Sequence, residues 1–252
     1  MIQADMKRIL ASLWFWGALI MGFALFTHSL IHEVLIYGKA ASPMVLLSYP
    51  LALSSFTPFA PIFCYLPYAI SFCRDVNADY HILIASRIGT KRYGMARSIS
   101  VALSGGIVMG IIFSVTILLC VLFAAYPDTA ETVDFMRNTT WARAGLLLVQ
   151  NGLWVYLGRI ALAFLFGALW ALVGLAISTI SPNRYVVLVA PFAIYQILWY
   201  ILGSSMFNPL HILRADLDAL PSIAFVFIYQ IFWLAVLFMA SYLGIRRKCK
   251  NA

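Results

Sequence analysis

Six long apolar stretches, separated by short polar segments, dominate the pattern of this chain. They lie at approximately residues 12–36, 46–72, 99–125, 159–180, 185–203 and 222–245. Each is long enough for a helix to cross a hydrocarbon core of about 30 Å, which takes roughly 18–20 residues. The pattern predicts an all-α integral membrane protein in which residues 1–252 form a single transmembrane domain of six spans.

The composition supports this class, because 63% of the residues are hydrophobic and only 10% are charged. A soluble domain of this length could not bury so much apolar surface, and its exterior would carry far more charge. The net charge of +8 does not indicate a nucleic-acid partner, since basic residues beside membrane spans are expected from orientation and from anionic lipid. We therefore expect a multi-pass protein of the cell membrane, surrounded by lipid.

The charges between the spans predict the orientation, because Lys and Arg concentrate in cytoplasmic loops. With the N-terminus inside, twelve of the 17 basic residues lie on the inner side and six of the nine acidic residues lie outside. The inner basic residues are Lys7, Arg8, Arg74, Arg87, Lys91, Arg92, Arg97, Arg184, Arg246, Arg247, Lys248 and Lys250. Both termini are therefore predicted to be cytoplasmic.

Residues 145–180 form an apolar run that is too long for one crossing and too short for two. A seventh crossing would also place the basic C-terminal tail outside. We expect 160–180 to be the span and 145–157 to be an outer-leaflet or re-entrant segment. Gln150, Asn151 and Trp154 in that segment suit an interface or a protein-lined cavity better than lipid.

The second stretch carries four prolines, Pro50, Pro58, Pro61 and Pro67, so its helix should be kinked or broken. Broken membrane helices persist where the freed carbonyls face protein or a water-filled path. Two interpretations stay open, namely bundle packing and moving parts that line a route across the membrane. For the second, the candidate path residues are Pro58, Pro61, Tyr65, Trp154 and Arg159.

Two absences limit how the chain could use energy. No span has a charged residue near its centre, whereas ion-coupled transporters usually place such residues at mid-membrane. There is also no G-x-x-x-x-G-K-[ST] phosphate loop. We expect no cofactor on this chain and no catalytic residues, and any energy source must come from another polypeptide.

The outer end of the first span carries His28, His32 and Glu33. The two histidines are four residues apart, as in metal-binding helices, but no further ligand is near enough in sequence to complete a site. A polar cluster at the headgroups is the main interpretation, with contact to a substrate or partner as the alternative, and no metal site is predicted. The four cysteines show no C-x-x-C pairing, so neither zinc nor disulfides are expected.

Residues 74–97 form the only sizeable inner loop. Within it, 81–85 is predicted as a short helix whose apolar residues, Ile82, Leu83 and Ile84, are too few to cross a bilayer. They could pack into a groove of a cytoplasmic partner while charged neighbours contact its rim. Residues 1–11 mix basic and apolar positions and predict an interfacial helix. Lipid-facing loop material is the alternative for both segments.

These features together resemble the permease subunits of type-two ABC exporters. The segment Ser86-Arg87-Ile88-Gly89-Thr90-Lys91-Arg92-Tyr93 is similar to that family's loop ending, in which a basic-Gly-basic run and an aromatic residue precede the third span. The topology of six spans, an amphipathic N-terminal helix and a coupling helix between spans two and three is also similar.

The resemblance implies a translocation path formed by two permease copies, identical or related, in a bacterial cytoplasmic membrane. Two cytoplasmic ATPase subunits, which hold ATP and Mg, would dock on residues 81–93 and on the N-terminal helix. The implied cargo is an amphipathic or hydrophobic peptide, drug or lipid. The coupling residues would be Asp75, Asp79, His81, Arg87, Lys91, Arg92 and Tyr93.

Two other classes of function stay open from the sequence. The first is a non-transporting membrane protein, such as a sensor, an immunity protein or an assembly scaffold. The second is a membrane-embedded enzyme, for which His28, His32 and Glu33 would have to supply the catalytic groups.

Overall fold

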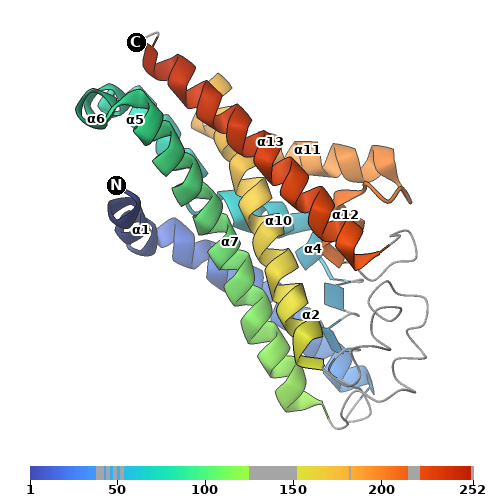
Figure 1. The fold of residues 1–252 in the computed structure, drawn as a ribbon. Coiled ribbons are helices and arrows are strands. Elements are labelled where there is room, and N and C mark those ends of the chain that lie inside the picture. Colours follow the sequence, from blue (N-terminus) through green and yellow to red (C-terminus); the bar gives the residue numbers. More distant parts are fainter. Residues whose placement is uncertain are drawn as a thin grey trace.

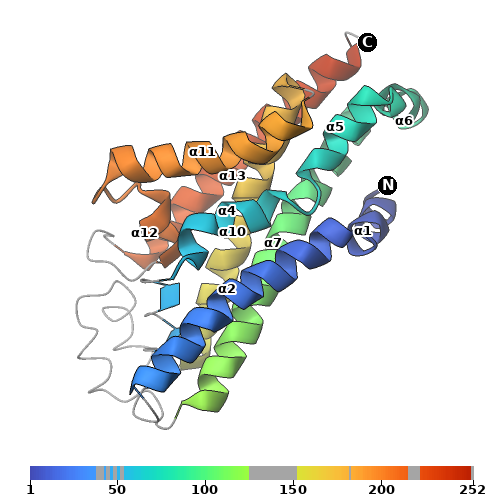
Figure 2. The same cartoon turned by 180° about the vertical axis from the view of Figure 1, so that it is seen from behind.

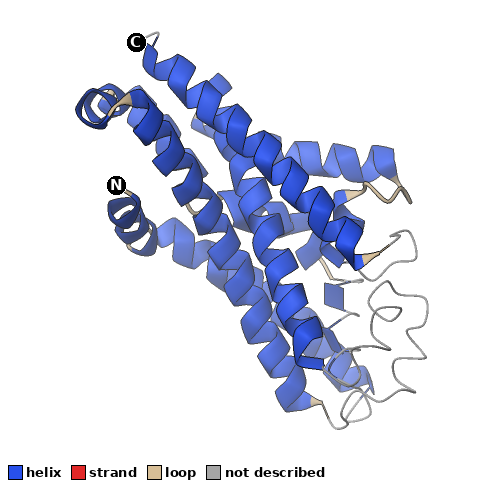
Figure 3. Cartoon of the chain, in the orientation of Figure 1, coloured by secondary structure: helices blue, strands red, loops and turns tan. Residues whose placement is uncertain are grey.

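The computed structural model describes residues 1–37, 43, 46–47, 50–51, 54–124, 152–181, 183–214 and 222–250, without the side chains at 33, 36, 37 and 152–155. Within these ranges every regular element is a helix (Figure 3). Six helical stretches are long and apolar enough to cross a membrane. The predicted all-helical architecture with six membrane-length apolar helices is therefore confirmed, while the side of the membrane on which each end lies stays a prediction.

The helix boundaries follow the apolar stretches closely. The bounds of the long helices are α2 Leu13–Tyr37, α7 Thr90–Phe123, α10 Gly152–Ile180, α11 Arg184–Leu202 and α13 Ile223–Lys250. The third span begins at Thr90 rather than near 99, because the polar residues that precede it continue the helix. We expected an outer segment that ends at residue 157 and a separate span that begins at 160. The structure shows no such division near Leu157, because α10 is one continuous helix from Gly152. Residues 145–151 lie outside the described residues.

The second span is broken, as its prolines predict. It consists of α4 (Phe56–Tyr65) and α5 (Ala69–Asn77), joined by a turn that contains Pro67. Pro61 lies inside α4 and has no N–H, so the Thr57 carbonyl four residues earlier loses its helical donor. Tyr195 of α11 replaces that donor, since its hydroxyl donates to the Thr57 carbonyl over 3.1 Å. The break thereby attaches α4 to α11.

The helices α7 and α10 form the tightly packed centre of the bundle. Gly105 and Gly167 face each other so closely that a Cβ on Gly105 would lie 2.4 Å from the Gly167 carbonyl oxygen. In a membrane, such small residues allow two backbones to approach and gain van der Waals contact. Gly174, further along α10, similarly accommodates Tyr65 and Ala69 of the broken span.

Both chain ends lie at the same end of the bundle (Figure 1, Figure 2). The N-terminal helix α1 (Ile2–Leu10), the short helix α6 (Tyr80–Ile88) and the C-terminal end of α13 gather there. We call this the termini end. The helix α11 crosses obliquely to α10 and α13, and the short helix α12 (Pro209–Arg214) follows it (Figure 1).

Candidate functional site

The predicted coupling helix is present as α6, between α5 and α7 at the termini end. Asp79 begins it in the left-handed backbone region with φ 52°, and Gly89 ends it with φ 84°. A positive φ is accessible to glycine at little cost and is tolerated by aspartate, so both residues suit these sharp turns. The two turns set α6 off as a separate short element at the termini end, near the C-terminal end of α13 (Figure 1).

The predicted coupling residues divide into two groups. Asp79, Arg87, Lys91 and Arg92 are exposed, together with the apolar Leu83, which is 60% exposed. We call these five residues the α6 surface. It combines three cations with an apolar contact point, which suits a protein partner that offers an apolar groove with an acidic rim.

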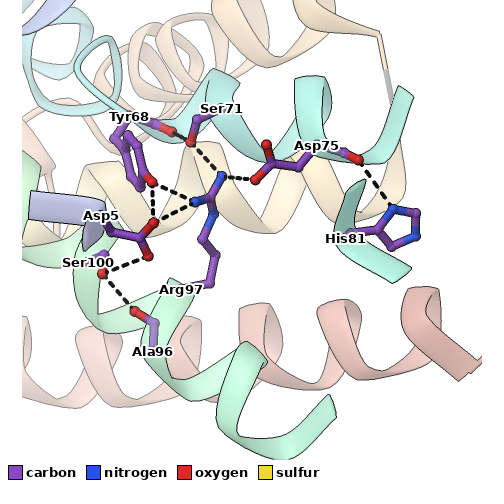
Figure 4. Close-up of polar contacts among 8 residues, drawn as sticks. All are labelled: Asp5, Tyr68, Ser71, Asp75, His81, Ala96, Arg97 and Ser100. Carbon is purple, nitrogen blue, oxygen red and sulfur yellow. Dashed lines mark hydrogen bonds and ion pairs between the residues drawn. The ribbon is translucent and has the colours of Figure 1, made fainter. Parts of the chain in front are cut away.

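The other three predicted coupling residues are buried within the chain. His81 lies 3% exposed, and its Nδ1 is 3.3 Å from the carbonyl oxygen of Asp75 (Figure 4). Tyr93 is fully buried in α7. The Asp75 carboxylate is engaged by Arg97. These residues hold the loop to the bundle, and they present little side-chain surface to a partner.

Arg97 is the centre of a buried polar network that joins three helices (Figure 4). Its Nη1 donates to the Tyr68 hydroxyl over 2.6 Å and to Asp5 Oδ1 over 3.3 Å. Its Nη2 donates to Asp75 Oδ2 over 2.6 Å and to Ser71 Oγ over 2.8 Å. We call Asp5, Tyr68, Ser71, Asp75, Arg97 and Ser100 the Arg97 network.

The N-terminal helix enters this network through Asp5, which is only 4% exposed. The Tyr68 hydroxyl donates to Asp5 Oδ1 over 2.7 Å, and Ser100 Oγ lies 3.3 Å from Asp5 Oδ2. An amphipathic helix that merely rested on the membrane would turn such a carboxylate toward water. Instead, α1 is attached to α7 by the Asp5–Arg97 ion pair and to the turn before α5 by the hydrogen bond from Tyr68.

The electrostatics of the network explain why it persists. Taking a guanidinium out of water costs several kcal/mol unless it is paired and hydrogen-bonded. Arg97 is 1% exposed, and it has two carboxylate partners and the face of the Tyr68 ring, whose centroid is 4.5 Å from Cζ. The two carboxylates exceed the one guanidinium by one negative charge. Removal of the arginine would therefore leave two buried anions without their cation.

The sequence predicted Arg97 only as an inner-side orientation charge, and it predicted Asp5 only as part of an interfacial helix. One signal was present. Acidic residues are few on the predicted inner side, and they are Asp5, Asp75 and Asp79. Two of these three bind Arg97 in the structure. Acids placed where basic residues are expected can thus indicate internal ion pairs.

A second feature is an apolar cavity of about 410 Å³ between α10, α11, α12 and α13. Trp170, Tyr229 and Trp233 contribute aromatic surface to it. The amide side chain of Gln230 also lines it, and Gln230 is 1% exposed. Neither Oε1 nor Nε2 of Gln230 has a hydrogen-bond partner among the described residues. A buried amide in this state costs about 1–3 kcal/mol, which a polar group on a ligand would recover.

Four of the predicted path residues, Pro58, Pro61, Tyr65 and Arg159, do not line this cavity. The Tyr65 hydroxyl donates to the Leu188 carbonyl, and the Pro58 carbonyl accepts from Gln196 Nε2 over 3.0 Å. Pro61 and Tyr65 are buried in the contact between α4 and its neighbours. These residues join the broken span to α11, so the packing interpretation of the prolines accounts for their positions.

Arg159 is also buried, and its Nη1 donates to the Arg214 carbonyl over 2.9 Å. It therefore fixes α12 to α10. The side chain of Trp154 lies outside the described residues. His28 and His32 are exposed on α2, and no group of three metal-binding side chains occurs in the part of the chain that the structure describes.

The chain matches no protein-family model, and no curated protein or solved structure is significantly similar to it.

Proposed function

We propose that this chain is the membrane-spanning permease subunit of an ABC exporter, driven by a separate cytoplasmic ATPase that binds ATP and Mg. Two copies, or this chain and a related one, would form the route for an amphipathic or hydrophobic substrate across a bacterial cytoplasmic membrane. The observation that carries the proposal is the Arg97 network, which links α1 and α5 to α7 directly beside the exposed α6 surface.

The geometry suits the transmission of movement. An ATPase that binds the α6 surface would displace α6, whose two ends continue into α5 and α7. Because Arg97 bonds to Asp75 and Asp5, the displacement of α5 would be shared with α7 and α1. The long helix α7 packs against α10, so the movement would reach the far end of the bundle. Coupled rigid-body movement of packed helices is an established form of switching.

The cavity at Gln230 supports an amphipathic cargo. Its aromatic and aliphatic lining would take the hydrocarbon part of a ligand. The unpartnered amide would bond to one polar group, which discriminates such a ligand from a plain hydrocarbon. A peptide, a drug or a lipid-like molecule has both parts.

The proposal is tested by purifying the tagged chain from its native membrane. We expect a phosphate-loop ATPase to co-purify in stoichiometric amount and to hydrolyse Mg-ATP. The double variant Arg87→Glu, Arg92→Glu should insert normally and lose this ATPase, because the change reverses the charge of the α6 surface.

The matched control is Arg247→Glu with Lys250→Glu, which makes the same charge change on exposed residues at the end of α13. It should retain the ATPase. If both double variants retain it, the docking assignment is wrong. If the wild-type chain purifies without any ATPase, the exporter proposal itself is contradicted and a non-transporting role is favoured.

A further inference from the structure

Three hollows adjoin one another at the termini end, and all three are lined by Arg74. The largest, of about 740 Å³, lies between the α1–α2 junction and α5. A hollow of about 290 Å³ lies between Trp14, α5 and α11, and one of about 460 Å³ lies between α5 and the start of α11. The three hollows together are lined by Arg8, Trp14, Arg74, Arg184 and Tyr185, and we call these five residues the arginine groove.

The groove is positively charged. Its three arginines are exposed and come from α1, α5 and α11. Asp75 is the one carboxylate among the lining residues, and it is already bound by Arg97. The Arg74 guanidinium has no hydrogen bond or ion pair with any described residue. Arginines that converge without a balancing acid suit a phosphate group, which accepts several N–H donors at once.

The other lining residues indicate an amphiphile rather than a soluble anion. Trp14 is 53% exposed and Tyr185 is 63% exposed, and such aromatics mark the headgroup level of a membrane. Beside them, Leu66 of the turn before α5, Ile70 of α5 and Leu188 of α11 continue the groove as an apolar surface. A headgroup at Arg74 would therefore be followed by hydrocarbon surface at the depth where acyl chains begin.

We propose that the arginine groove is a binding site for one anionic phospholipid. Its phosphate lies against Arg74, with Arg8 and Arg184 on either side, and an acyl chain follows Leu66, Ile70 and Leu188. Basic pockets between spans on the cytoplasmic side hold anionic headgroups in this way. The lipid would join α1, α5 and α11, which supports the elements around the Arg97 network from outside. This site does not depend on the exporter proposal.

Quenching of tryptophan fluorescence by brominated lipid tests the site. The purified chain is placed in phosphatidylcholine nanodiscs that contain a small fraction of brominated phosphatidylglycerol or, in a parallel set, brominated phosphatidylcholine. We expect phosphatidylglycerol to quench far more strongly, and Trp14→Phe should remove most of that excess. Arg74→Gln should weaken the preference about five-fold, and Arg184→Gln by a similar factor, since each variant removes a cation beside the lipid phosphate.

Arg247→Gln is the matched control, because Arg247 is exposed at the same end but does not line the groove. It should leave the preference unchanged. If Arg247→Gln weakened the preference for phosphatidylglycerol as much as Arg74→Gln does, diffuse surface charge would account for the preference. That result would overturn the proposed site. Excess inorganic phosphate should not displace the lipid, and complete displacement would overturn the assignment to a phospholipid. Circular dichroism of each variant establishes that it is folded.

Discussion

Asp75 and Arg97, 22 residues apart in the chain, form a buried ion pair in which Nη2 donates to Oδ2 over 2.6 Å. The pair joins α5 to α7 immediately behind α6, the helix that connects them. The pair thereby holds together the two helices that flank α6, and Asp5 adds α1 to the same network.

Replacement of Arg97 should destabilise the protein strongly. Arg97→Met keeps apolar bulk but leaves Asp5 and Asp75 buried without a cation, a situation that costs about 3–5 kcal/mol. Thermal unfolding in detergent should show a much lower Tm for this variant. Arg92→Met, which removes an exposed arginine from the same helix, should change the Tm little. Equal Tm values for the two variants would show that the network does not stabilise the fold.

The attachment of α1 should depend on the charge of Asp5. Asp5→Asn keeps an oxygen acceptor for Tyr68 but loses the ion pair with Arg97. We expect faster backbone hydrogen exchange in residues 2–10, with little change in α13. Asp79→Asn is the control, since Asp79 is exposed. Unchanged exchange in α1 of the Asp5 variant would contradict the proposed attachment.

The close contact between α7 and α10 leaves no room for an added methyl group at Gly105. A Cβ at Gly105 would meet the Gly167 and Cys64 carbonyl oxygens at 2.4 and 2.6 Å, and backbone atoms yield little. Overpacking of this kind costs about 1–3 kcal/mol, so Gly105→Ala should lower the Tm. Gly17→Ala in α2 meets nothing within 4 Å and should raise the stability slightly, because alanine favours a helix. A Gly105→Ala protein as stable as the wild type would refute the close contact.

Replacement of Gln230 by an apolar residue should weaken the response to cargo without lowering the stability of the protein. Gln230→Leu removes two unpartnered polar atoms from an apolar cavity, so the variant should be at least as stable as the wild type. We also expect it to lose the stimulation of the partner's ATP hydrolysis by amphipathic cargo. A matched change on the exposed face of α13, Phe232→Leu, should leave that stimulation intact. Undiminished stimulation in Gln230→Leu would remove the cavity from the cargo route.

The sequence predicted much of the fold, because the membrane imposes a strong constraint. A helix must satisfy its own backbone groups in lipid, so apolar length alone located the spans. Proline chemistry likewise predicted the break around Pro67, since a missing N–H can be read directly from the chain. The short helix between α5 and α7 was also correctly expected, within a few residues of Tyr80–Ile88.

The candidate sites were harder to predict, because they depend on which residues of distant segments meet. Nothing in the local pattern shows that Asp5 lies against Arg97, since 92 residues separate them. Within residues 74–97, polarity did not predict which side chains are exposed. The polar Asp75 and His81 are buried, whereas the apolar Leu83 is exposed. The burial of Gln230 depends on four helices that enclose it.

Reconstitution into sealed vesicles tests the central claim most directly. The purified chain is inserted alone, or together with the ATPase that co-purifies with it, and accumulation of an amphipathic cargo against its gradient is measured with and without Mg-ATP. We predict uphill movement only when the ATPase and Mg-ATP are both present, with loss of movement in Arg87→Glu, Arg92→Glu. Uphill movement by this chain alone would contradict the account.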